Sequence, residues 1–196
     1  MTFFGNQKDL KAKPKDVWRH SGTDLFGKQY VLKNERQEWQ TPPQVFSFIN
    51  KKYKLNHDAC ASETNHLCKN YWTANDNALL QDWGGKRIWC NPPWGSSQKD
   101  IEVWSSKAYR ESLKPNTLIC FLFPINTSAN WFVNNICYAD KVYNWIGNLK
   151  WKRYDSKGQL LKSCLPFSTA VAVFKGSNKS NKEIMLESVF YDTTLD

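Results

Sequence analysis

The first strong pattern in the chain is helical and begins at residue 41. Thr41 is predicted to be the N-cap, with Pro42 in the first turn and Gln44 completing a capping box. The apolar positions that follow recur at helical spacing, and they are Val45, Phe46, Phe48, Ile49 and Tyr53. The pattern predicts a helix that runs to about Lys52, whose first N–H groups would attract an anion such as a carboxylate.

Short apolar runs that end in polar residues predict the strands of a sheet. The predicted strands span residues 55–59, 70–73, 87–90, 117–123, 141–145, 148–154 and 169–174. The run at 117–123 is almost continuously apolar, which is typical of a strand covered on both faces. Two further helices are predicted at residues 99–113 and 129–137. Strands and helices therefore alternate through the middle of the chain, and the later part is predicted to be β.

The predicted strand at residues 87–90 ends abruptly at Asn91-Pro92-Pro93-Trp94. At the end of a parallel strand, such a sequence forms a rigid turn that faces the ligand crevice. The Asn91 side-chain oxygen and the Pro92 carbonyl can each accept an N–H bond from the exocyclic amine of a planar ring, which stabilises the charge that develops as the nitrogen attacks. Pro93 helps to fix these acceptors, and Trp94, expected to be exposed, offers a stacking face. An Asn-Pro-Pro-aromatic string by itself is more often an ordinary turn beside a core aromatic. The choice between a turn and a ligand site therefore depends on the neighbouring segments.

A second candidate site follows the predicted strand at residues 55–59. Asp58 is followed by three small residues, Ala59, Cys60 and Ala61. Small residues let a ligand lie against the backbone at a strand end, while the carboxylate takes an ammonium or hydroxyl group. The segment lacks the glycines of a G-x-G-x-x-G loop, so it is weak evidence by itself.

Two more acidic residues follow the predicted strand at 70–73. Asp76 and Asp82 are both candidates for contact with an adenine amino group or a ribose hydroxyl. A turn or cap role explains either residue equally well. Asp76 is favoured by its place before the Ala-Leu-Leu run, but the alternative stays open.

The composition suits a single basic domain that binds a polyanion. The chain has 196 residues, a net charge of +9 and 10 tryptophans. Residues 8–38 are polar and basic, and Lys150, Trp151, Lys152 and Arg153 interleave cations with an aromatic ring, which favours contact with phosphates and an unstacked base. A basic protein with a tryptophan-rich core and an exposed hairpin strand explains these features about as well.

Cysteine usage and the N-terminus indicate a cytoplasmic protein. The six cysteines include no C-x-x-C pair and no histidine at ligand spacing, so we expect reduced thiols and no metal. No stretch of the sequence resembles a signal peptide or a membrane span. We therefore expect no contact with membranes.

The order of these segments resembles the S-adenosylmethionine-dependent amino-methyltransferases, and in detail the phage-type DNA N6-adenine methyltransferase (Dam) family. The resemblance runs from about residue 39 to residue 175. It rests on residues 39–42, 58–62, 71–73, 78–79, 82–83 and 89–94, on Asn65 and Cys68, and on the late strand at 169–174. Many relatives have Tyr or Phe where this chain has Trp94.

The resemblance implies a fold, a reaction and site residues. The fold would be α/β and Rossmann-like, a mostly parallel sheet with helices on both faces and an antiparallel hairpin at one edge. Residues 1–38 would form a basic arm, 39–176 the methyltransferase domain and 177–196 a tail. The cofactor would be S-adenosylmethionine, bound by Thr41, Pro42, Asp58, Ala59, Cys60, Ala61 and Asp76 or Asp82. Asn91, Pro92, Pro93 and Trp94 would form the catalytic motif.

The substrate implied by the resemblance is adenine in double-stranded DNA, flipped out of the duplex before its N6 amine is methylated. The protein would act in the cytoplasm, that of the host cell if it is viral. An enzyme of the same fold that methylates RNA adenine or a protein glutamine is an alternative. A nucleic-acid-binding module without catalysis is another, and it predicts no binding of S-adenosylmethionine.

Overall fold

The computed structural model describes residues 21–23, 29–31, 39–94, 98–146, 149, 151–154, 160–162, 168–176 and 185–190. Of the predicted N-terminal arm, it describes only a short antiparallel pair, β1 (Ser21–Thr23) and β2 (Gln29–Val31). Of the predicted tail, it describes β12 (Met185–Phe190), which pairs in parallel with a strand of the main sheet. Part of the segment predicted to be a tail therefore belongs to the sheet.

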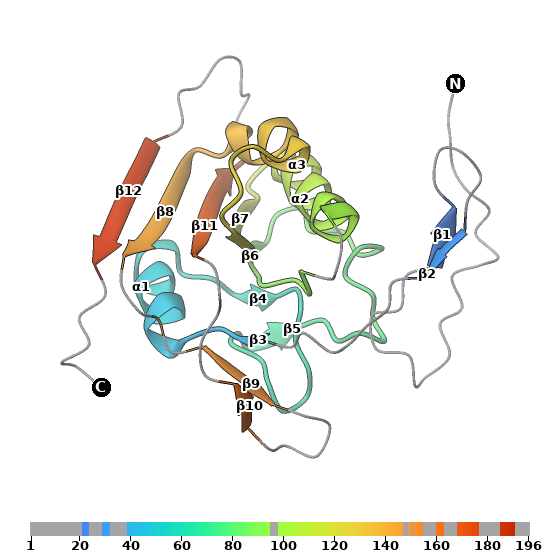
Figure 1. The fold of residues 1–196 in the computed structure, drawn as a ribbon, viewed down its shortest axis with the longest axis horizontal. Helices are drawn as coiled ribbons and strands as arrows, with labels where there is room; N and C mark the ends of the chain where they lie inside the picture. The colour runs from blue at the N-terminus through green and yellow to red at the C-terminus, as the bar shows by residue number, and fades with distance from the viewer. Residues whose placement is uncertain are drawn as a thin grey trace.

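The main sheet has seven strands in the order β12-β8-β11-β7-β6-β4-β5 (Figure 1). Its other strands are β4 (His57–Asp58), β5 (Asn70–Tyr71), β6 (Arg87–Cys90), β7 (Leu118–Pro124), β8 (Lys141–Ile146) and β11 (Thr169–Lys175). β11 runs antiparallel to both of its neighbours, whereas the other pairs are parallel. The sheet is therefore mixed and mostly parallel, as predicted, and it is compatible with a Rossmann-like fold.

Three α-helices, α1 (Pro43–Tyr53), α2 (Gln98–Ser112) and α3 (Asn130–Asn134), cover the sheet. The ring of Tyr53 in α1 meets Tyr143 of β8, and the ring of Trp131 in α3 meets Phe123 of β7. Tyr143 pairs with Val171, which pairs with Leu122, and residues that pair across strands share a face. Tyr143 and Phe123 therefore point to opposite faces, so helices lie on both sides of the sheet.

The predicted helix at residues 129–137 is wrong in extent, because it is interrupted after one turn. Asn135 leaves helical geometry with φ −128° and ψ −52°, and a 3₁₀ turn follows at Ile136–Tyr138. The side chain of Asn135 instead donates to the hydroxyl of Ser105 on α2, 3.0 Å away. This contact between helices takes precedence over the local helical pattern.

The predicted hairpin is present, but its position at an edge of the main sheet is wrong. β9 (Lys152–Tyr154) and β10 (Leu160–Lys162) pair with β3 (Trp39–Gln40) in a separate three-stranded sheet, seen below the main sheet in Figure 1. Trp151, which directly precedes β9, is buried and its ring meets that of Trp94 at 5.6 Å. This packing places the start of the hairpin beside the corner that follows β6.

Tryptophan is mostly a core residue in this protein. The buried tryptophans are Trp39, Trp83, Trp89, Trp94, Trp104, Trp131, Trp145 and Trp151. Because aromatic side chains bury large apolar areas, these eight of the ten tryptophans account for much of the core. The high tryptophan content therefore reports on packing and is no evidence for base stacking.

Candidate active site

One cavity of about 430 Å³ lies at the ends of β4 and β6. These strands are adjacent and parallel, with Asp58 paired to Trp89, so their carboxyl ends open at the same edge of the sheet. Among the residues predicted from sequence, the cavity is lined by Thr41, Asp58, Cys60, Ala61, Asn91, Pro92 and Pro93. Pro42, Ala59, Asp76, Asp82 and Trp94 do not line it. The two motifs that the sequence singled out, at Asp58 and at Asn91, thus meet in one cavity.

The side-chain amide of Asn91 has a fixed orientation. Its Nδ2 donates to the backbone carbonyl of Trp39 at 2.9 Å and to the hydroxyl of Thr41 at 3.1 Å. A backbone carbonyl can only accept, so the contact with Trp39 identifies the nitrogen end of the amide. Both N–H groups are engaged, and Oδ1, which no donor among the described residues contacts, is the end left to accept from a substrate.

Thr41 is not the helix cap that the sequence predicted. The N-cap of α1 is Pro42, without a side-chain cap bond, and the helix begins at Pro43. The Thr41 hydroxyl accepts from Asn91 instead. The local capping signal is correct about where the helix begins, and a contact with a distant residue takes the hydroxyl that was expected to cap it.

Asp58 organises the loop that forms one wall of the cavity. Its Oδ1 accepts the N–H of Cys60 at 3.2 Å and its Oδ2 accepts the N–H of Leu67 at 3.0 Å. Burial raises the pKa of Asp58, and these two N–H bonds together with His66 act against that rise. The loop between these contacts contributes six residues to the cavity wall, from Cys60 to Asn65.

The thiol of Cys60 in the cavity wall is protonated, because burial holds its pKa high. Cys60 and Cys90 lie with their sulfur atoms 3.8 Å apart, and both are free. Burial raises the pKa of Cys60 well above its ordinary value. A protonated thiol is a poor nucleophile, so Cys60 has a packing role in the cavity wall.

Asp76 holds a segment of the cavity wall without lining the cavity itself. Its Oδ2 accepts both the N–H and the hydroxyl of Thr73, each at 2.7 Å. The N–H bond of Thr73, followed by its hydroxyl bond, lowers the pKa of Asp76. Thr73, Ala74 and Asn75 line the cavity, although Asp76 itself does not.

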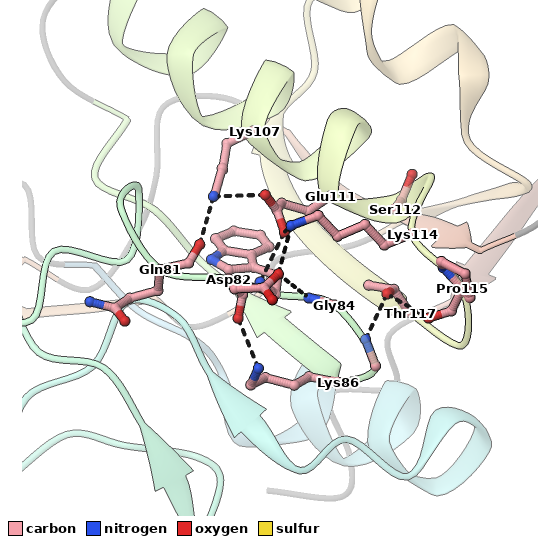
Figure 2. A network of polar contacts seen from close by, with 12 residues as sticks. Gln81, Asp82, Gly84, Lys86, Lys107, Glu111, Ser112, Lys114, Pro115 and Thr117 are labelled. Carbon is pink, nitrogen blue, oxygen red and sulfur yellow. Dashed lines mark hydrogen bonds and ion pairs between the residues drawn. The ribbon is translucent and has the colours of Figure 1, made fainter.

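Asp82 belongs to a different network, shown in Figure 2. Its exposed carboxylate accepts from Lys114 at 2.6 Å and from the N–H of Gly84 at 2.9 Å. The Lys114 bond, followed by that of Gly84, lowers the pKa of Asp82 to about 2. Lys114 also contacts Glu111 of α2, so this carboxylate ties the turn before β6 to a helix.

The aromatic ring at the end of the Asn-Pro-Pro motif is not exposed. Trp94 is only 6% exposed, its Nε1 donates to the carbonyl of Leu122 at 3.4 Å, and its ring packs edge-on against Trp151. The expectation of an open stacking face at Trp94 is therefore wrong for this conformation. The ring instead braces the corner that carries Asn91.

The predicted nucleic-acid segment at residues 150–153 is only partly described. Lys152 is exposed, whereas Trp151 is 2% exposed and cannot serve as a surface aromatic in this conformation. Lys150 and the side chain of Arg153 lie outside the described part of the chain. The reason for the burial of Trp151 is its contact with Trp94.

Sequence reasoning did not single out several residues that line the cavity as site residues. They are Trp39, Ser62, Glu63, Thr64, Asn65, Leu67, Thr73, Ala74, Asn75 and Trp89. Ser62 and Asn65 exchange backbone hydrogen bonds of 3.0 and 3.2 Å, so Glu63 and Thr64 form the tip of a tight turn. The polar run at 62–65 is a turn signal that could have indicated this segment.

None of the helices in the described part of the chain has the length and apolarity needed to cross a lipid bilayer. Within the same ranges, acidic residues, histidines and cysteines do not gather in any group of three or more that could hold a metal ion.

Comparison with known proteins gives consistent matches. A family model described as DNA N-6-adenine-methyltransferase (Dam) matches residues 28–188. A DNA N-6-adenine-methyltransferase of Escherichia phage T1 is 34% identical over 115 residues, which cover 56% of this chain and 46% of the phage protein. A protein of the same name from Haemophilus phage HP1 is 30% identical over 110 residues, which cover 55% of this chain and 61% of the relative. The aligned segment thus spans about half the length of these curated relatives.

Proposed function

Because the chain belongs to the DNA N-6-adenine-methyltransferase (Dam) family, we propose that it transfers a methyl group from S-adenosylmethionine to the N6 amine of adenine in DNA. The observation that carries the proposal is the shared cavity, where the Asn91 amide and the Asp58 loop meet. One segment would receive the amine and the other the methyl donor. The two phage relatives are named for the same activity.

The residues of the cavity fit the proposed cofactor. A volume of about 430 Å³ lies within the range of about 300–1,000 Å³ that is common for ligand pockets. Asp58 is a buried carboxylate, and each of its oxygens can accept a further bond beside the N–H that it already holds. In this proposal Asp58, Cys60 and Ala61 bind one part of the cofactor and Thr41 and Pro42 flank its amino-acid end.

Asp76 acts in this proposal through the segment that it supports. It holds Thr73, and the three residues from Thr73 to Asn75 would contact the cofactor adenine. Asp82 is engaged with Lys114 on the surface, so the geometry favours Asp76 of the two candidates.

Asn91 and Pro92 would act directly on the substrate amine. The amine nitrogen of adenine is a poor nucleophile because its lone pair is delocalised into the ring. Oδ1 of Asn91 and the carbonyl of Pro92 would each accept one of its N–H bonds, which draws the nitrogen towards tetrahedral geometry and stabilises its growing positive charge. S-adenosylmethionine, when bound, supplies the methyl group. Pro93 and Trp94 hold the corner rigid, so the acceptors need no rearrangement during the reaction.

Duplex DNA as the substrate is supported by the charge of the protein and is consistent with a cavity at the end of two strands. The net charge of +9 favours a polyanion, and Lys152, together with Lys150 and Arg153, would contact its phosphates. The cavity lies at a strand end, so the target adenine would have to leave the base stack at a cost of about a few kcal/mol. The reaction would take place in the cytoplasm of the host cell.

Replacing Asp58 by alanine is expected to raise the dissociation constant for S-adenosylmethionine by about tenfold to a hundredfold, since two hydrogen bonds to a charged group that shape the cavity wall are lost. Isothermal titration calorimetry measures the constant, and duplex affinity serves as the internal control. A variant that binds the cofactor normally and loses only its affinity for DNA would contradict the assignment of Asp58.

The acceptor class is tested by offering methyl-labelled S-adenosylmethionine with duplex DNA, single-stranded RNA or a glutamine-containing peptide. Label is expected in the duplex only. Label in RNA or in the peptide supports the corresponding alternative. A protein that shows no thermal shift with S-adenosylmethionine would instead be a binding module without catalysis.

A further inference from the structure

The orientation of the Asn91 amide depends on two groups outside the Asn-Pro-Pro motif. One is the backbone carbonyl of Trp39 at 2.9 Å, and the other is the hydroxyl of Thr41 at 3.1 Å. Together they take both hydrogens of the amide nitrogen. If either were missing, an N–H of a half-buried amide would lose its partner, and one bond instead of two would hold the amide in its orientation.

Both groups are themselves held in place. Trp39 and Gln40 form β3, which pairs with Arg153 and Lys152 of β9. Trp39 and Thr41 are each only 8% exposed. On the other side, the carbonyl of Pro42 accepts the first N–H bonds of α1, at 3.0 and 3.3 Å. The segment that orients Asn91 is therefore anchored by a strand pair before it and by a helix after it.

We propose that the Trp39 carbonyl and the Thr41 hydroxyl are positioning groups for the methyl-transfer reaction, and that they make this chain depend on an asparagine, or an equivalent hydrogen donor, at position 91. The inference rests on the proposed function, because it assigns Oδ1 of Asn91 as the acceptor for the substrate amine. Beyond that function, Trp39 and Thr41 fix the orientation of this acceptor, and an ionised aspartate would lack the hydrogen that the Trp39 carbonyl accepts.

An ionised aspartate cannot replace Asn91 because it has no hydrogen to donate. The Thr41 hydroxyl can turn and donate to a carboxylate, but the Trp39 carbonyl has no hydrogen to give. An ionised aspartate at position 91 would place an oxygen against that carbonyl, where the amide nitrogen now lies at 2.9 Å. A protonated aspartate would donate its hydroxyl hydrogen to Trp39 and keep its other oxygen as an acceptor. It would thus keep the contact with Trp39 and the free acceptor, while the Thr41 hydroxyl would turn and donate to it.

The carboxylates nearest to position 91 also disfavour an ionised aspartate there. Asp58 of β4 and Glu63 at the turn tip line the same cavity, and like charges disfavour a further ionised carboxylate. Cys60, also in the cavity wall, and Cys90, next to Asn91 on β6, are free thiols. His66 lies near Asp58 in an exposed turn, and Lys152 on β9 opposite Gln40 is exposed, so water weakens the effect of both.

The first test is the pH dependence of N91D. Above the pKa of the new carboxyl group, its single-turnover rate relative to wild type is expected to fall by about tenfold per pH unit up to about pH 9, because only the protonated form has the required donor. The ratio should level off at lower pH. A ratio that stays constant over this range, at whatever level, overturns the proposal.

The second test separates positioning from cofactor binding. T41V removes the hydroxyl that Asn91 engages and keeps the backbone that would flank the cofactor. It is expected to lower the single-turnover rate by about fivefold to tenfold, with an unchanged dissociation constant for S-adenosylmethionine. T41S keeps the hydroxyl and should restore the rate. T169V alters another buried threonine, outside the cavity, and should leave the rate unchanged.

Each outcome of the second test has one meaning. A T41V rate equal to that of wild type, or a T41S rate as low as that of T41V, contradicts a positioning role. So does a loss confined to cofactor affinity. Absence of methyl transfer by the wild-type protein would instead contradict the proposed function itself, so the two failures are distinguishable.

Discussion

Replacing Asn91 by alanine is expected to abolish methyl transfer and to leave the affinity for S-adenosylmethionine nearly intact. In the proposed reaction, Oδ1 of Asn91 accepts from the substrate amine, and this interaction would strengthen as positive charge develops on the nitrogen. Removing a preorganised group of this kind costs about a hundredfold to a thousandfold in rate, and more when no water can replace it. Most of the contacts assigned to the cofactor lie on the Asp58 loop and on residues 73–75, which the change does not alter.

A single-turnover assay and a calorimetric titration on the same preparation measure both quantities. Asn134 at the end of α3 is exposed and lies outside the cavity, so N134A is the matched control and should behave as wild type. Loss of rate and of cofactor affinity together would indicate that Asn91 is structural. A rate within a factor of about three of wild type would show that Asn91 is not the acceptor.

The second large effect is expected away from the cavity, at Glu111. Its carboxylate accepts the N–H of Trp83 at 2.9 Å and contacts Lys107 at 2.9 Å and Lys114 at 2.6 Å (Figure 2). Lys107 also donates to the carbonyl of Gln81, so the network ties the turn before β6 to α2. E111A leaves the buried N–H of Trp83 without its partner and removes one of the partners of each lysine, and it is expected to lower the free energy of unfolding by about 3–5 kcal/mol.

Urea denaturation measures this loss, and E102A on the exposed side of the same helix is the matched control, with an expected change within about 0.5 kcal/mol. An equal effect of both substitutions would show that the network contributes little. Because the turn feeds β6, the destabilised variant should also bind S-adenosylmethionine less well at elevated temperature.

The contribution of Glu111 should depend on pH. Burial by itself would raise the pKa of Glu111, but the bonds from Lys114, Lys107 and the Trp83 N–H outweigh it and lower the pKa below the ordinary value of 4.5. A carboxyl group with a lowered pKa in the folded state stabilises the protein fully above its unfolded pKa and loses that contribution as the pH falls through the folded value. The difference in stability between wild type and E111A should therefore narrow below pH 4.5.

The meeting of Asp58 and Asn91 in one cavity could be predicted from the sequence, because both residues lie at the ends of neighbouring parallel strands. Asp58 lies at the end of the predicted strand at residues 55–59 and Asn91 follows the apolar run at residues 88–90, and the ends of adjacent parallel strands necessarily meet at one edge. One strand end carries a carboxylate before small residues, and the other carries an amide before two prolines. Both arrangements favour ligand binding. That is why two local patterns sufficed to predict one cavity.

The predictions that failed involve contacts between distant parts of the chain. Thr41 fits a capping box locally, but its hydroxyl is taken by Asn91, 50 positions away. Trp94 was expected to be exposed, but it packs against Trp151. Thr41 directly follows β3 and Trp151 directly precedes β9, and no local periodicity encodes the pairing of these two strands. The hydrogen bond and the ring contact could therefore not be predicted from local patterns.

The most direct test of the account is nucleoside mass spectrometry of duplex DNA after incubation with the wild-type protein and S-adenosylmethionine carrying a deuterated methyl group. The account predicts labelled N6-methyladenine from the wild type and none from N91A. Label on cytosine, or no labelled nucleoside from a wild-type protein that demonstrably binds the cofactor, would contradict it.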